Sequence, residues 1–159
     1  MAFFQTGSAI GVNLGNSDGA TAKFTLGTRV SGSNDTEWVY VRANVALTTG
    51  HVLKVNTAFS AALSNGSLLG KELAFAQGTF SASDYGFVAK RGIAIYAKFT
   101  AAATAGAQLY LNNPGSGVLR QAAATATLKG VSLITTQTAA TRRALLVYAT
   151  WPRVVALTG

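Results

Sequence analysis

The stretch Glu37-Trp-Val-Tyr-Val-Arg-Ala-Asn-Val45 decides the fold class, because its residues alternate between two chemical kinds. Every second residue is small or aliphatic, namely Val39, Val41, Ala43 and Val45, and the residues between them are Trp38, Tyr40, Arg42 and Asn44. Successive side chains of a β-strand point to opposite faces of its sheet. The stretch therefore predicts a strand whose aliphatic face belongs to the core.

The same period of two recurs along the chain, between clusters of Gly, Asn, Asp and Ser that are typical of turns. Residues 92–99 are predicted to form a strand that pairs with residues 85–90 through a tight turn at Arg91-Gly92. In this strand one face should carry Ile93, Ile95, Ala97 and Phe99. Further strands are expected at residues 23–30, 51–56, 71–77, 107–111, 127–135, 144–151 and 154–157. The only helical candidates are two short alanine-rich segments, residues 58–63 and 121–126.

These patterns predict a single-domain, all-β protein, either a β-sandwich or a β-barrel. Residues 31–159 should form its body, and residues 1–30 an extended N-terminal arm or first strands. With 49% hydrophobic residues and no cysteine, a chain of 159 residues can fold on a core without disulfides.

Charged residues make up 11% of the chain, against about 25% in ordinary soluble domains. A surface with few charges loses little hydration when a partner covers it, so the composition favours assembly. A neutral surface that no partner covers explains the same figure equally well.

The residue types needed for catalysis are scarce in this sequence. The chain has one histidine, His51, and five carboxylates, and neither a Gly-x-Ser-x-Gly elbow nor a phosphate-binding loop is present. Asp35 and Glu37 would share a strand face, but we expect Asp35 to cap its turn and Glu37 to face solvent. We therefore expect no enzyme activity, no cofactor and no metal, with His51 in a surface or hydrogen-bonding role.

Charge is divided unevenly along the chain. Five acids and five bases precede Tyr85, whereas eight bases and no acid follow it, so the formal net charge of +8 lies in the C-terminal half. A basic surface suits an acidic protein face, nucleic acid or anionic lipid. Because the bases are scattered, without the clusters of nucleic-acid binders, an acidic protein surface is the preferred partner and nucleic acid is not. Neither a signal peptide nor an apolar run of membrane-spanning length is found, so no membrane association is expected.

Four segments, taken in order, point to a known family. They are Arg42-Ala-Asn-Val-Ala-Leu-Thr-Thr-Gly50, Asp84-Tyr-Gly-Phe-Val-Ala-Lys-Arg-Gly92, Gln108-Leu-Tyr-Leu-Asn-Asn-Pro-Gly115, and Lys129-Gly-Val131 followed by Ala144-Leu-Leu-Val147. Together they resemble the head decoration, or cement, proteins of tailed bacteriophages, over roughly residues 37–151. The chain departs from many members of that family in its strong basicity, and no counterpart of residues 1–30 is recognised there.

The resemblance implies an all-β structural protein on the outer capsid surface of a virion, which reinforces the shell and often forms a homotrimer. The implied partners are the major capsid protein and further copies of the chain. We expect Phe3 and Phe4 to anchor the arm, and Arg142, Arg143 and Arg153 to meet an acidic face.

Two other functions remain open. One is a carbohydrate-binding or adhesive β-sandwich on a virion surface, in which Trp38, Tyr40 or Tyr110 would stack on sugars. The other is a basic nucleic-acid-binding barrel, for which the candidate stacking residues are Tyr85, Phe87, Tyr96, Phe99 and Tyr110.

Overall fold

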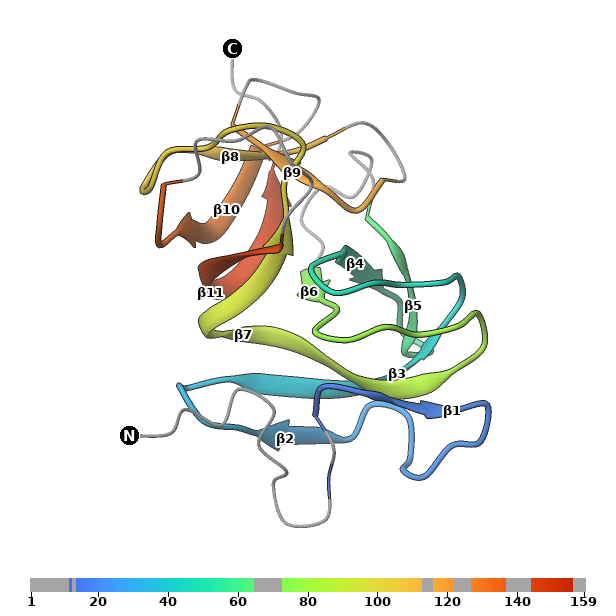
Figure 1. The fold of residues 1–159 in the computed structure, drawn as a ribbon. Coiled ribbons are helices and arrows are strands. Elements are labelled where there is room, and N and C mark those ends of the chain that lie inside the picture. The colour runs from blue at the N-terminus through green and yellow to red at the C-terminus, as the bar shows by residue number, and fades with distance from the viewer. Residues whose placement is uncertain are drawn as a thin grey trace.

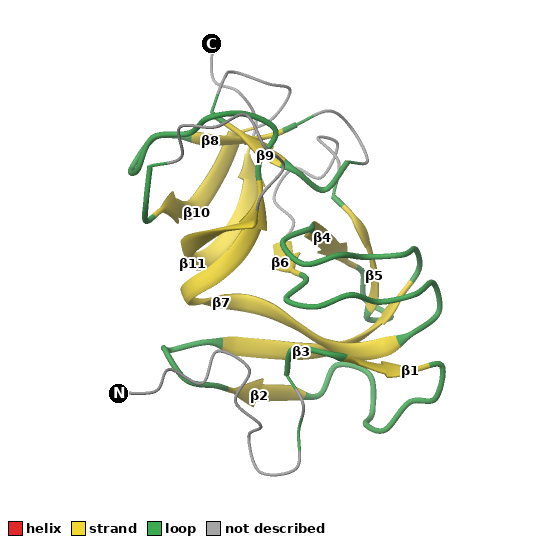
Figure 2. Cartoon of the chain, viewed as in Figure 1, coloured by secondary structure: helices red, strands yellow, loops and turns green. Residues whose placement is uncertain are grey.

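The computed structural model describes residue 12 and residues 14–64, 73–112, 116–121, 127–136 and 144–155; within the last range, only the side chains of Ala149 and Pro152 are described. Every regular element in these ranges is a β-strand, which confirms the all-β prediction (Figures 1 and 2). The strands are β1 (Ser17–Gly19), β2 (Arg29–Ser31), β3 (Glu37–Ala43), β4 (Val52–Val55), β5 (Ser60–Leu63), β6 (Leu73–Phe75), β7 (Tyr85–Lys98), β8 (Leu109–Leu111), β9 (Leu119–Arg120), β10 (Thr127–Leu133) and β11 (Ala144–Val155).

Five strands close into a barrel, here called the first ring, in the order β3-β5-β4-β6-β7 and back to β3. All of its pairings are antiparallel except that of β3 with β5. A cluster of buried small, aliphatic and aromatic side chains belongs to this ring and the loops beside it: Val39, Val41, Ala43, Leu47, Leu53, Ala61, Ala74, Ala76, Phe80 and Val88. Because the ring is closed, each of the five strands has a neighbouring strand on both sides, so the barrel protects its own backbone hydrogen bonds.

The C-terminal half of β7 leaves the first ring and enters a second sheet, in the order β7-β11-β10-β8-β9 (Figure 1). A single parallel bridge between Phe99 and Leu119 joins the two ends of this sheet, and Thr100 N donates to Leu119 O at 3.0 Å. The second sheet is therefore also rolled into a ring, here called the second ring. The two rings share one strand, β7.

A layer formed by residues 14–31, here called the N-terminal layer, lies against the outer face of β3 and β7 (Figure 1). Phe24 packs edge-on against Tyr40, with 5.3 Å between ring centroids, and the Tyr40 hydroxyl donates to Asp18 Oδ2 at 2.8 Å. Trp38 and Tyr40 are consequently as buried as the valines on the opposite face of β3. The sequence prediction assigned the core to the aliphatic face alone, and it is wrong because the N-terminal layer covers the other face.

The predicted hairpin at Arg91-Gly92 is also wrong, because β7 runs without a turn from Tyr85 to Lys98. Gly92 and Ala94 have φ angles of 138° and 65°, so the strand bends at this point and continues. The bend interrupts the predicted alternation: Ile93 is 47% exposed, whereas Ile95 is buried as predicted.

The helix predicted over residues 58–63 is wrong: residues 58 and 59 complete a turn, and residues 60–63 are β5. Asn56 Oδ1 accepts hydrogen bonds from Ala58 N at 3.0 Å and Ser60 N at 2.9 Å, and Phe59 has a φ angle of 55°. A side-chain acceptor that replaces the backbone acceptors, followed by a left-handed residue, starts a turn and not a helix.

Other predicted elements differ in extent or lie partly outside the described residues. Of the strand predicted at residues 23–30, only the end is part of β2, and the strand expected at 154–157 is the end of β11 as far as Val155. The second helical candidate lies almost entirely outside the described residues, as do Lys71 and Glu72 of the strand predicted at 71–77.

The bend in β7 can be tested by adding one methyl group. A Cβ at Gly92 would lie 2.7 Å from Thr36 Cα, whereas a Cβ at Gly19, where φ is 80°, would meet nothing within 4 Å. We expect Gly19→Ala to cost about 1 kcal/mol from its backbone conformation alone, and Gly92→Ala to cost at least about 3 kcal/mol. Urea unfolding of both variants measures the difference. Equal losses would show that Gly92 and Thr36 do not approach each other as described.

Candidate partner-binding surface

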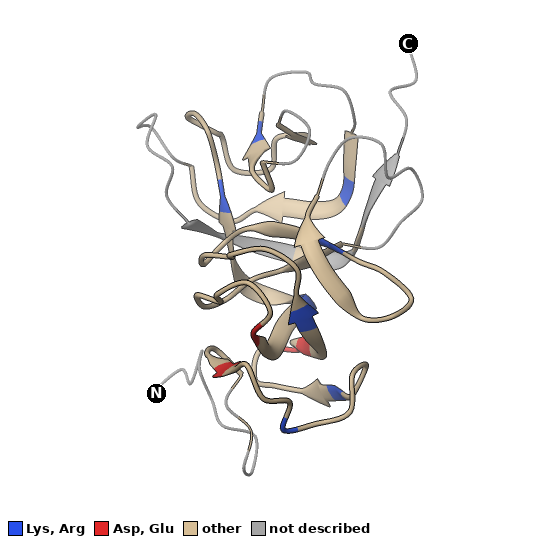
Figure 3. Cartoon of the chain, turned by 90° about the vertical axis from the view of Figure 1, so that its right-hand side faces the viewer, with Lys and Arg blue, Asp and Glu red and all other residues tan. Residues whose placement is uncertain are grey.

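The described carboxylates gather around the N-terminal layer and the adjoining part of the first ring (Figure 3). Asp18 binds Lys23 Nζ at 2.9 Å and accepts the Tyr40 hydroxyl, and Asp84 Oδ2 accepts from Ser17 Oγ at 2.7 Å and Ser81 N at 2.9 Å. These carboxylates hold the N-terminal layer on the barrel. Their contacts are structural and leave little charge to offer a partner.

Asp35 and Glu37 are joined by arginines from two other strands. Arg91 Nη2 lies 3.3 Å from Asp35 and Arg91 Nε lies 3.6 Å from Glu37, which also binds Arg29 Nη1 at 3.0 Å. The Glu37 side chain is only 18% exposed, so the expectation that it faces solvent is wrong. Two guanidinium groups hold the pair of carboxylates in place and make it an ion-pair network.

The second ring carries bases without acids. No Asp or Glu follows Asp84 in the sequence, and the described bases of this ring are Lys98 at the end of β7, Arg120 on β9 and Lys129 on β10. Figure 3 shows the separation: acids occur only in the lower part of the molecule, and Lys and Arg also occupy the upper part. Lys129 is exposed and makes no ion pair within the described residues. The uneven charge along the chain is thus also a separation in space.

Of the predicted partner-binding residues, four fall outside the described residues: Phe3, Phe4, Arg142 and Arg143. The fifth, Arg153, lies on β11 at the position that pairs with Lys129. Lys129 itself was not singled out from the sequence. The sequence does show that Lys129 is one of the bases in the C-terminal half, where no acid occurs. Only the strand register shows that it lies opposite Arg153.

An open hollow of about 350 Å³ lies beside Lys129. Its lining includes Gln108, Lys129, Gly130 and Ser132, next to a shift in register between β10 and β11. Gln108 Nε2 donates to Leu128 O at 2.7 Å and so fixes one wall. An ammonium group, a hydroxyl and an exposed bulge together suit an acceptor-rich, acidic side chain.

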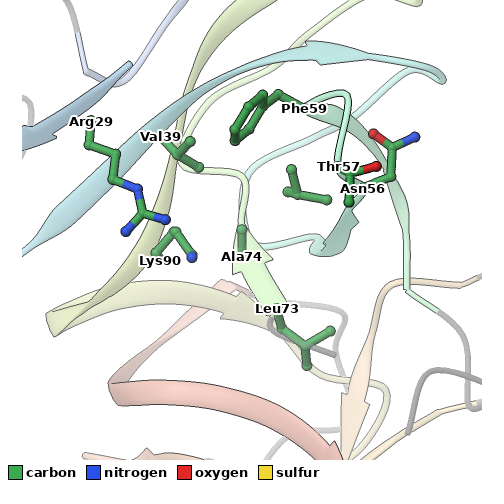
Figure 4. Close-up of a pocket in the computed structure, with 9 residues that line it drawn as sticks. Arg29, Val39, Asn56, Thr57, Phe59, Leu73, Ala74 and Lys90 are labelled. Atoms are coloured by element: carbon green, nitrogen blue, oxygen red, sulfur yellow. The ribbon is translucent and has the colours of Figure 1, made fainter. Parts of the chain in front are cut away.

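A smaller cavity of about 170 Å³ opens at one end of the first ring (Figure 4). Arg29 and Lys90 lie on one side of it and Asn56 and Thr57 on the other, over a floor that includes Leu73 and Ala74. Lys90 is only 7% exposed, and Arg29 binds Glu37. Lys90 therefore belongs to the interior of the first ring, whereas Arg29 belongs to the N-terminal layer and its side chain is 54% exposed.

The aromatic residues proposed as binding platforms are mostly buried. Trp38 is 4% exposed and Tyr40 is fully covered, so neither can stack on a sugar. Phe87 and Phe99 are equally enclosed and cannot stack on nucleobases. Of the named platforms, the tyrosines Tyr85, Tyr96 and Tyr110 remain partly accessible.

His51 lies where the two rings meet, in a hydrogen-bonding role as predicted. Thr48 N donates to His51 Nδ1 at 3.2 Å, and His51 Nε2 lies 3.4 Å from both Thr48 Oγ1 and Lys98 Nζ, while Lys98 Nζ also donates to Thr48 Oγ1. Burial and the nearby Lys98 ammonium lower the pKa of His51 from its usual 6.5 to about 4. The imidazole is therefore held neutral at this junction.

This arrangement predicts a loss of stability in acid. Because the pKa of His51 is lower in the folded protein, the unfolded chain takes up the proton first. The contribution of neutral His51 to the free energy of unfolding is complete above pH 6.5 and is lost as the pH falls to about 4. After allowance for solvent at a half-buried site, we expect a loss of about 1 to 2 kcal/mol. Urea unfolding from pH 7 to pH 4 measures it, and His51→Gln should flatten this part of the profile; parallel profiles for the two proteins would contradict the assignment.

Within the described ranges no group of three or more His, Cys, Asp or Glu side chains could hold a metal ion, and no helix there is long and apolar enough to span a membrane. The second ring is thus basic and has an open hollow, and one strand, β7, joins it to the first ring, around which the described carboxylates gather. Compared with known proteins, the chain matches no family model and no curated protein.

Proposed function

We propose that this chain is a structural protein of a tailed-phage virion, without catalytic activity, that binds the outer surface of the capsid and reinforces the shell. The observation that carries the proposal is the separation of charge between the rings. Paired carboxylates hold the N-terminal layer on the first ring, and the second ring presents bases with no acid among them. A rigid all-β body with one basic end suits attachment to an acidic protein lattice.

Docking would use the second ring. An acidic side chain of the major capsid protein would enter the hollow beside Lys129, and Arg153 pairs with Lys129 in the neighbouring strand. Arg142 and Arg143, between β10 and β11 in sequence, would add to the same positive field. Charges at the rim of an interface mainly set the rate of association, and buried apolar anchors set the rate of dissociation. We assign the anchoring role to Phe3 and Phe4.

Copies of the chain would associate with one another on the capsid, as a trimer in the simplest case. The low charge content supports this part of the proposal, because neutral surface is buried at little cost in hydration. Two exposed isoleucines, Ile93 at 47% and Ile134 at 43%, offer apolar contact area on the second ring.

The alternative functions have less support. Sugar stacking loses two of its three aromatic residues to the core, and base stacking loses Phe87 and Phe99. Tyr85, which remains accessible, already lies beneath the Arg42 guanidinium at 5.9 Å from the ring centroid.

The proposal predicts that neutralising a base matters on the second ring and not on the N-terminal layer. Lys129→Gln should slow association with undecorated capsids of the same virus by about two- to fivefold at low salt, because it removes one unit of the attracting charge. The matched control Lys23→Gln changes a side chain that is 62% exposed and should associate at the parent rate. Surface plasmon resonance on immobilised capsids measures both rates.

The salt dependence separates electrostatic docking from loss of fold. At high ionic strength, the Lys129→Gln and parent rates should converge, because screening removes the attraction in both. Binding that is independent of salt, or an equal loss in both variants, would contradict docking through the second ring. Failure of the parent protein to bind such capsids at all would contradict the proposed function itself.

A further inference from the structure

A third cavity, an open hollow of about 370 Å³, lies on the outer face of the first ring, beside the cavity of Figure 4, with which it shares Asn56 and Thr57, and is separate from the basic second ring. It forms because the middle strand of the order β3-β5-β4 presents only small side chains to solvent there, Ser60 and Ala62. Lys54 pairs with Ala62 across β4 and β5, and Asn44 N donates to Ala61 O from the other side. Longer side chains on the two outer strands thus form walls around a floor of small ones.

The walls of this hollow offer mainly hydrogen-bond donors. Asn56 Oδ1 is occupied by the amides of Ala58 and Ser60, so the side chain has only its NH₂ group to offer a ligand. Lys54 can only donate, and it makes no ion pair within the described residues. Asn44 and Thr57 complete the polar lining.

The floor adds a polar atom that needs a partner. Ser60 Oγ is buried and has no hydrogen-bond partner among the described residues. A buried hydroxyl without a partner costs free energy, and a bound polar molecule that displaces the atoms covering Ser60 Oγ would supply the missing bond.

We propose that this hollow binds a hydroxylated carboxylic acid of monosaccharide size, the class to which the uronic acids belong. The carboxylate would lie at Lys54, and the hydroxyl groups would bond to the amides and hydroxyls of the remaining lining. The hollow exceeds the size of a carboxylate alone, and its several neutral polar groups suit a polyol. None of the described residues that line it is aromatic, so a neutral sugar would gain no stacking energy from them.

This site is independent of capsid binding, and the isolated full-length protein suffices to test it. Titration with glucuronate, followed by ¹H–¹⁵N NMR, should shift the amides of β4 and β5 with a dissociation constant on the order of 1 mM. Glucose, which lacks the carboxylate, and acetate, which lacks the hydroxyls, should each bind at least about fivefold more weakly.

Two substitutions test the geometry. Lys54→Met keeps the length of the side chain, removes its charge and should weaken glucuronate binding about tenfold; the control Lys23→Met, on the N-terminal layer, should leave it unchanged. Ala62→Leu fills the hollow without changing any charge and should abolish the shifts. Dispersed spectra of each free variant show that it is folded.

Three results would overturn the proposal: glucuronate binding no tighter than glucose or acetate, shifts centred outside β4 and β5, or equal binding by Lys54→Met and the parent protein. Each would show that the polar lining does not select a hydroxylated acid.

Discussion

The continuity of β7 is the constraint on which the rest of the structure depends. This strand pairs with β3 and β6 in the first ring, with β1 in the N-terminal layer and with β11 in the second ring. The strand therefore contributes hydrogen bonds to both rings and to the N-terminal layer. Its passage between the rings requires the bend at Gly92, where a close approach to Thr36 leaves no room for a side chain. Past the bend, the side-chain amide of Gln77 bonds to both Tyr96 N and Tyr96 O, as a neighbouring strand would.

This arrangement gives the two ends of the molecule different electrostatic character. On the first ring and the N-terminal layer, acids and bases form short ion pairs that hold this layer in place. These charges therefore stabilise the fold. Arg91, although it belongs to the C-terminal bases by sequence, lies among these acids. All strands of the second ring follow Asp84, the last Asp or Glu in the sequence, so none of them carries a carboxylate side chain. A partner that carries acidic groups would relieve the repulsion between the bases of this ring.

Local alternation predicted the longer strands but not their neighbours; β5 was predicted as a helix, and β1 and β9 were not predicted. β3 was identified from its period of two, yet the burial of Trp38 and Tyr40 depends on the N-terminal layer, for which the sequence predicted a strand at residues 23–30 but no contact with β3. Arg91-Gly92 has the composition of a turn, and only long-range pairing on both sides of Gly92 makes it a bend within one strand. The candidate site could likewise be predicted only in part. Counting charges along the sequence located the basic half of the chain. The structure was needed to show that Lys129 pairs with the position of Arg153 and that Arg91 lies among the acids of the first ring.

Hydrogen–deuterium exchange of the protein bound to capsids, compared with the free protein, tests most directly that the second ring is the docking end. Peptides from β8 and β10 should become protected on the capsid, while those from β1 and β2 should exchange at the same rate in both states. Protection confined to β1 and β2, with β8 and β10 unchanged, would contradict this assignment and place the interface on the N-terminal layer.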